Sequence, residues 1–148
     1  MPDAFDMLGL AARFDLSADD VRSAYLARVG GARGRRGSEE AGWPGVGEEG
    51  ERHAAALNLA KSTLMNPEAR ANALLLRLGG PSREVSRELP DGFLAQMMEA
   101  REGLESAAAA RDGSGVARWT AWAEGERDGY VARVGALFKE FESSRQGR

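Results

Sequence analysis

The chain has 148 residues, of which 43% are hydrophobic and 29% are charged, and these proportions are typical of one ordinary globular domain or of two small ones sharing a core. Its formal net charge of -3 argues against a general nucleic-acid binder, and no uncharged apolar run is long enough to span a membrane. The absence of cysteine excludes disulfides and thiolate chemistry, and the spacing around the single histidine, His53, supplies no partners for a metal site.

The hydrophobic pattern is helical throughout, and its elements are separated by clear breaks. A short apolar segment occupies 3–9, and Ser17 with Asp20 has the spacing of a capping box for the helix that follows. That second helix is expected to stop at Gly30, because a flexible loop rich in glycine, arginine and glutamate occupies 30–50.

Two more helices are predicted before the middle of the chain. One runs from about 51 to 65, and the other begins after Asn66, a good cap, with Pro67 in its first turn and glycines at its end. Residues 1–80 are therefore expected to form one helical domain, which a linker over 81–90 separates from the rest.

Residues 91–148 are predicted to form a long antiparallel helical hairpin, which makes the fold class all-α. Asp91 is a plausible cap for its first helix, a turn is expected over 112–115, and the two helices are expected to be close in length. The expected core stripe of the first helix is Phe93, Met97, Ala100 and Leu104. The expected stripe of the second helix, which Glu126 interrupts, is Val116, Trp119, Ala123, Tyr130, Val134, Leu137 and Phe141. Trp119 and Trp122 are interpreted as anchors of the core and of a domain interface.

The sequence carries none of the common motifs of catalysis. A serine triad would have to use His53, and the sequence contains no Gly-x-Ser-x-Gly turn, no P-loop and no dinucleotide-binding glycine pattern. The N-terminus has no features of a secretory signal, so the cytoplasm is the expected compartment. The sequence therefore predicts a protein that is not an enzyme and that holds neither a cofactor nor a metal.

Three segments, in order along the chain, resemble the iron–sulfur co-chaperones of the HscB type. The first is Phe5, Leu8-Gly9-Leu10 and Arg13-Phe14-Asp15-Leu16-Ser17. The second is Leu57-Asn58-Leu59-Ala60, Thr63-Leu64, Asn66-Pro67 and Arg70-Ala71. The third is Phe93-Leu94-Ala95-Gln96-Met97-Met98-Glu99-Ala100-Arg101-Glu102. Together they span roughly residues 3–28 and 53–105.

In the resembled family, an N-terminal J-domain stimulates the ATPase of a DnaK-type chaperone, and a C-terminal three-helix bundle binds the scaffold protein on which iron–sulfur clusters are built. The resemblance thus implies a J-domain-like helical domain over 1–80 and a shortened version of the bundle over 91–148. Because only two helices are predicted in the second part, its remaining apolar surface is expected to pack on the first part or to make the protein a homo-oligomer.

The stimulation of the chaperone ATPase depends, in that family, on a His-Pro-Asp tripeptide at the end of the second helix. Its place falls here at about Arg33-Gly34-Arg35, and the chain contains no His-Pro-Asp. Gly30 and Gly31 are also expected to cut the second helix short. We therefore predict no stimulation of a DnaK-type chaperone by the usual route. The degenerate contact loop, which could still touch an acidic chaperone surface, comprises Arg33, Gly34, Arg35 and Arg36.

The resemblance assigns the scaffold-binding surface to five positions: Leu94, Ala95, Met98, Glu99 and Glu102. Leu94 and Met98 lie one turn apart beside the expected core stripe, and charged residues border them, as is typical of a docking patch. Ala95 stands where the family has a larger residue, which predicts a weaker affinity for a scaffold. The alternative is that Leu94 and Met98 fill a broad helical core or pack against the first domain.

Two functions remain open on this basis. The first is a divergent HscB-like co-chaperone or interaction protein related to iron–sulfur cluster assembly, with a scaffold protein as partner. The second is a helical interaction or regulatory module that keeps only the fold and acts in an unrelated pathway. Neither involves nucleic acid or a membrane.

Overall fold

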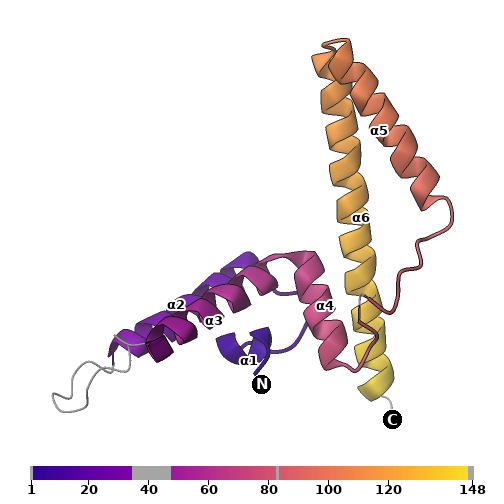
Figure 1. Cartoon of the computed structure of the whole chain (residues 1–148). Helices are drawn as coiled ribbons and strands as arrows, with labels where there is room; N and C mark the ends of the chain where they lie inside the picture. The colour runs from indigo at the N-terminus through magenta and orange to yellow at the C-terminus, as the bar shows by residue number, and fades with distance from the viewer. Residues whose placement is uncertain (1, 35–47, 83, 147–148) are drawn as a thin grey trace. The chain divides into compact units, whose positions relative to one another are not determined.

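The structure, a computed structural model, describes residues 2–34, 48–82 and 84–146, and all the regular structure in these ranges is helical (Figure 1). The predicted all-α class is therefore confirmed. The chain divides into two compact units, Met1–Ser82 and Arg83–Arg148, which are named unit 1 and unit 2 below.

Unit 1 begins with two helices whose ends follow from local sequence. Helix α1 (Ala4–Leu8) is capped by the Asp3 carboxylate and ends at Gly9, whose φ of 67° is a left-handed conformation that favours glycine. A side chain at Gly9 would also collide with the Arg28 guanidinium. Helix α2 (Ala18–Gly34) opens with the predicted capping box, because Ser17 N–H donates to Asp20 and Asp20 N–H donates to the Ser17 hydroxyl, both at 3.0 Å.

The predicted end of α2 at Gly30 is wrong. The helix continues through Gly30 and Gly31 to Gly34. A glycine inside a helix costs about 1 kcal/mol relative to alanine but removes no hydrogen bond, so two of them weaken the last turns without ending them. The expected loop over 30–50 is also shorter at its far end, since α3 (Glu48–Met65) starts with three glutamates that suit the positive end of the helix dipole.

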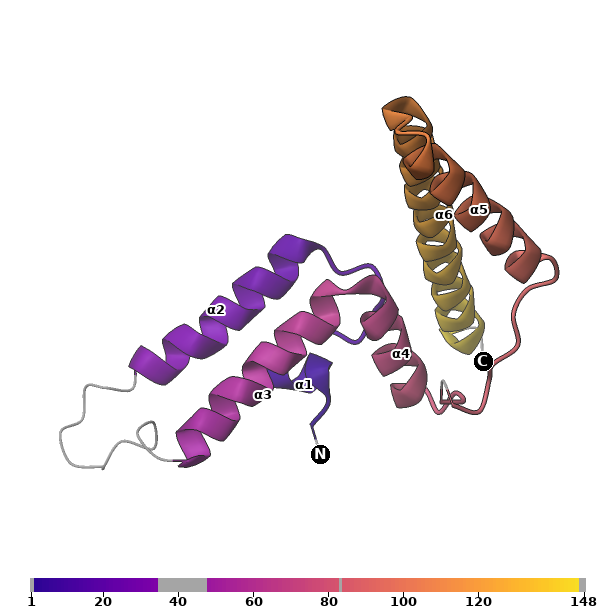
Figure 2. The ribbon, with the colours of Figure 1, turned by 45° about the horizontal axis from the view of Figure 1, so that its top comes forward.

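Helices α2 and α3 lie side by side, and α1 packs against α3 (Figure 2). Helix α4 (Pro67–Arg77) follows at once, with the Asn66 side chain accepting from the backbone N–H groups of Glu68 and Ala69, as the sequence predicted. The buried apolar side chains of unit 1 come from all four helices and from the segment between α1 and α2: Phe5, Leu8, Phe14, Leu16, Val21, Leu57, Ala60, Leu64 and Leu74.

Unit 2 is an antiparallel hairpin of α5 (Phe93–Ala109) and α6 (Gly113–Gln146) (Figure 1). The expectation of similar lengths is wrong, because α5 has 17 residues and α6 has 34. The expected turn over 112–115 is also displaced, since α6 already starts at Gly113 and Asp112 caps it by accepting from Gly115 N–H at 3.0 Å. Asp91 does not cap α5, whose N-cap is Gly92 in a left-handed conformation (φ 77°).

The two helices of unit 2 approach most closely near their turn. Ala107 lies against Gly115, and the Trp119 ring lies so close to Gly103 that any side chain there would collide with it. At the other end of α5, the larger rings of Phe93 and Tyr130 meet edge to face with their centroids 6.0 Å apart. The helices therefore diverge from the turn towards the start of α5, as both views show (Figures 1 and 2).

The predicted stripes of unit 2 need correction at both helices. Leu104, Ala123, Leu137 and Phe141 are exposed, whereas Gly103, Trp122 and Phe138 lie half-buried. Leu104 is exposed because, near the turn, the side of α5 that contacts α6 is the one that carries Gly103, where Trp119 fits only over a glycine. Glu126 lies half-buried on the stripe of α6, as predicted.

Candidate interaction surfaces

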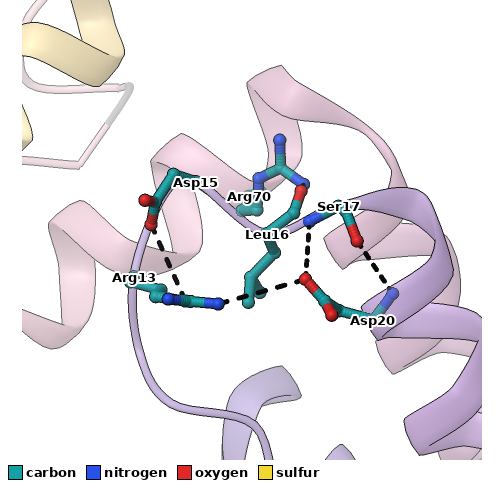
Figure 3. Close-up of polar contacts among 6 residues, drawn as sticks. All are labelled: Arg13, Asp15, Leu16, Ser17, Asp20 and Arg70. Atoms are coloured by element: carbon teal, nitrogen blue, oxygen red, sulfur yellow. Dashed lines mark hydrogen bonds and ion pairs between the residues drawn. The ribbon is translucent and has the colours of Figure 1, made fainter.

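The start of α2 is held by a cluster of polar groups (Figure 3). The Arg13 guanidinium lies 3.7 Å from the Asp15 carboxylate and 4.0 Å from the Asp20 carboxylate, which also accepts the Ser17 N–H. Hydrogen bonds from the Ser17 side chain and backbone, helped by the charge of Arg13, hold the pKa of Asp20 below its ordinary value. The charged side chains of this cluster are about half exposed, and the contacts fix the start of α2.

Arg70 is the one charged side chain buried among the described residues. Its guanidinium donates at 3.0 Å to the Leu16 carbonyl and at 2.9 Å to the Leu64 carbonyl, and it lies 5.1 Å from the Phe14 ring centroid. Burial lowers the pKa of Arg70, although the nearby Asp15 opposes that shift. Arg70 therefore joins the segment before α2 to the end of α3.

Helices α2 and α3 are joined further along by Tyr25. Its hydroxyl donates to the Asn58 side chain at 2.7 Å, and the Lys61 ammonium lies 4.6 Å from the ring centroid. Arg33 and Gly34, two positions of the predicted contact loop, belong to the last turn of α2. The other two, Arg35 and Arg36, lie outside the described residues.

The five predicted scaffold-binding residues on α5 are all exposed: Leu94, Ala95, Met98, Glu99 and Glu102. Leu94 is 62% exposed and Met98 is 56% exposed, so neither fills the core of the hairpin. With about 100° of rotation per residue, the centre of this set lies on the side of α5 opposite to the side that packs on α6. The structure thus places the five residues on one outward face, which we call the α5 surface.

Beyond Met98, towards the C-terminal end of α5, charged residues border the α5 surface, and the sequence analysis identified this border only in part. Arg101 and Glu105 form an ion pair one turn beyond Met98, with 2.8 Å between the Arg101 Nε and a Glu105 oxygen. The spacing of four residues was the signal that could have identified this pair. It continues the row of Leu94 and Met98 with two opposite charges.

Three comparisons with known proteins were informative to different degrees. No family model matches the sequence, and no curated protein matches it. Among solved structures, the chaperone HscB from Vibrio cholerae superposes with a TM-score of 0.70 at 24% sequence identity, over 95% of this chain and 82% of that one. The chain has the HscB fold. At this identity the likeness establishes the fold alone, and the function has to be argued from the residues.

The HscB fold extends over both units of the chain, since the superposition leaves out only a small fraction of it. The residues that give the hairpin of this HscB-like fold its shape include Gly103, which sequence reasoning missed. Trp119 packs over that glycine and meets Trp122 edge to face, with ring centroids 5.8 Å apart. Both tryptophans therefore belong to the α5–α6 hairpin, as predicted for the core.

His53 is exposed on α3, and nowhere in the described ranges do three or more histidine, cysteine, aspartate or glutamate side chains gather as a metal would require. Within the same part of the chain, none of the helices has the length and apolar character needed to cross a membrane.

Proposed function

We propose that this chain is a divergent HscB-like co-chaperone that binds an iron–sulfur scaffold protein through the α5 surface and does not stimulate the ATPase of a DnaK-type chaperone. The observation that carries the proposal is the exposure of Leu94 and Met98 on the outward face of α5. These residues stand at the positions that bind the scaffold in the family that the sequence resembles, and the HscB fold supports the correspondence.

The α5 surface has the chemistry of a small docking site. Leu94 and Met98 supply an apolar centre, and burying each side chain in an interface is worth about 2 kcal/mol. The unbranched Met98 side chain adapts its shape to a partner. Glu99 and Glu102 border the centre, so the surface favours a partner that presents apolar side chains flanked by lysine or arginine. Ala95 adds little area, which predicts a moderate affinity.

The expected lack of ATPase stimulation rests on the absence of a His-Pro-Asp tripeptide from the whole sequence. The structure removes one of the two reasons that the sequence suggested, because α2 is not cut short at Gly30. The expected lack of ATPase stimulation therefore depends on the residues at the end of α2 and not on the length of the helix.

Isothermal titration calorimetry with the iron–sulfur scaffold protein of the same organism tests the proposal. We expect the wild type to bind, and we expect Leu94→Ser/Met98→Ser to bind about 1,000-fold more weakly or not at all, since two central apolar contacts are lost. A matched control is Leu26→Ser/Leu59→Ser, which removes two similarly exposed leucines from unit 1. Circular dichroism verifies that each variant is folded.

The result decides between the two functions that the sequence left open. Binding that is lost only in the α5 variant supports the co-chaperone function. A folded wild type that does not bind the scaffold contradicts it, and the protein is then a helical interaction module with another partner. An ATPase assay with the DnaK-type chaperone tests the expected lack of stimulation, and stimulation by the wild type contradicts it.

A further inference from the structure

The apolar stripe of α6 continues beyond the reach of α5. Helix α5 begins at Phe93, whose ring meets Tyr130, and α6 extends from there to Gln146 (Figure 1). Tyr130 is followed at intervals of four, three and four residues by Val134, Leu137 and Phe141. This spacing is that of the contact row of a two-stranded coiled coil.

The row is open to solvent in its second half. Leu137 is 64% exposed and Phe141 is 42% exposed. The segment before α5 does not cover them with its own apolar side chains, because Val85 and Leu89 are themselves exposed. A row of large apolar side chains on a helix surface indicates a partner helix.

The charges beside the row indicate which helix that is. Arg133 and Glu140 are exposed, have opposite charge, and each immediately precedes a member of the row. Within one helix they are seven residues apart, which is about 10 Å along the axis, so they cannot pair with each other. Two antiparallel copies bring them together: the register that sets Val134 against Leu137 of a second copy also sets Arg133 against Glu140. Two-fold symmetry forms that pair twice.

We propose that a second copy of this chain docks antiparallel on the C-terminal half of α6, through Val134, Leu137 and Phe141, with reciprocal Arg133–Glu140 ion pairs. The same register places Phe141 of one copy beside Tyr130 of the other. Arg133 is already positioned near this site, since its guanidinium lies 5.5 Å from the centroid of the Tyr130 ring. A parallel arrangement would leave Arg133 without an acidic partner.

The contact comprises about two heptads, so it belongs to the class of small, transient interfaces and gives a concentration-dependent dimer. This inference is independent of the proposed function, because the α5 surface lies on a different helix. The two can therefore fail or succeed separately.

Sedimentation velocity of the full chain over a range of concentrations tests the proposal. We expect a monomer–dimer equilibrium that Leu137→Ser abolishes and that Arg133→Glu or Glu140→Arg weakens by about tenfold, because each change replaces two attractive pairs by two repulsive ones. The double variant Arg133→Glu/Glu140→Arg should restore the wild-type equilibrium. The matched control is Lys139→Glu, which makes the same change of charge on the opposite side of α6 and should leave the equilibrium unchanged.

Cysteine cross-linking provides a second measurement, because the natural chain has no cysteine. A mixture of Val134→Cys and Leu137→Cys chains should form a mixed disulfide dimer under mild oxidation, since the two positions face each other in the antiparallel register. A wild type that stays monomeric at every concentration overturns the proposal. It is equally overturned if the charge-swapped double variant does not recover, or if Leu137→Cys cross-links to itself faster than to Val134→Cys.

Discussion

Replacement of the buried Arg70 provides the sharpest test of what holds unit 1 together. Its two hydrogen bonds end on the carbonyls of Leu16 and Leu64. The Leu64 carbonyl belongs to the last turn of α3, where carbonyl groups have no partner within the helix, and the helix cannot supply one because the Glu68 N–H donates to the Asn66 side chain. Arg70→Met keeps most of the side-chain volume and removes both donors.

The expected cost follows from these two bonds. A hydrogen bond from a charged donor contributes about 1.5–3 kcal/mol, and leaving a buried carbonyl without a partner costs about 1–3 kcal/mol. Part of this loss is offset, since methionine does not carry the desolvation cost that lowers the pKa of the buried guanidinium. The net effect should be a decrease of about 3 kcal/mol in the free energy of unfolding. With an ordinary dependence on urea, that decrease lowers the midpoint by about 1–3 M.

Urea unfolding followed by far-ultraviolet circular dichroism measures this change. Arg70→Lys should recover only part of the loss, because both bonds come from the Nη1 atom and the lysine nitrogen ends one bond closer to the backbone, short of that position. Arg22→Met is the control within unit 1, since Arg22 is an exposed arginine that pairs with Asp19, and its replacement should alter stability by less than about 0.5 kcal/mol. An Arg70→Met variant as stable as this control would refute the reasoning.

Further predictions concern the packing around two glycines in unit 2 and the stability of unit 1 in acid. Gly103→Ala should destabilise the hairpin by about 1–2 kcal/mol and change the near-ultraviolet circular dichroism of the tryptophans, because the new methyl group collides with Trp119. Gly125→Ala, at a helical glycine with open space around it, should instead stabilise α6 by up to about 1 kcal/mol, and the opposite order of these two variants would contradict the packing described. Burial tends to raise the pKa of Asp3, but a backbone amide and Arg77 outweigh it and hold the pKa below the ordinary value of 3.8. The stability that this carboxylate contributes is therefore present above about pH 4 and lost as the pH falls through its folded-state pKa. Asp3→Asn should make thermal stability less dependent on pH in that range, and an unchanged decrease of stability in acid would count against the ion pair between Asp3 and Arg77.

The parts of the fold that the sequence predicted correctly are those decided within one turn of the chain. The capping box of Ser17 and Asp20 and the cap at Asn66 depend only on neighbouring residues, and both formed as expected. The end of α2 was predicted wrongly, because a glycine such as Gly30 lowers helix stability without ending a helix. Local propensity could not show that α2 continues beyond it.

The packing of α5 shows a second limit of sequence reasoning. Helical periodicity separated Leu94 and Met98 from the buried side, and the structure places both in solvent. The same periodicity wrongly assigned Leu104 to the core, since it assumes that one straight line along the helix faces the partner. Near the turn, the contact with α6 shifts to Gly103, because a glycine there lets Trp119 approach the backbone. Such a contact depends on both helices, so the spacing of residues in one helix cannot predict it. Whether the α5 surface binds a scaffold stays a prediction.

The continuation of α2 to Gly34 changes what the missing tripeptide means. Had the helix stopped at Gly30, a chaperone-contact loop of the resembled family would have had no support, and restoring its residues would do nothing. Because the helix reaches Gly34, we expect Arg33→His/Gly34→Pro/Arg35→Asp to gain measurable stimulation of a DnaK-type ATPase. Helix α2 already ends at Gly34, so a proline at that position interrupts no later turn. Arg33→Ala/Arg35→Ala, which removes the same two charges without creating the motif, is the control and should give no stimulation. A folded triple variant that remains inactive would show that unit 1 lacks more than the tripeptide.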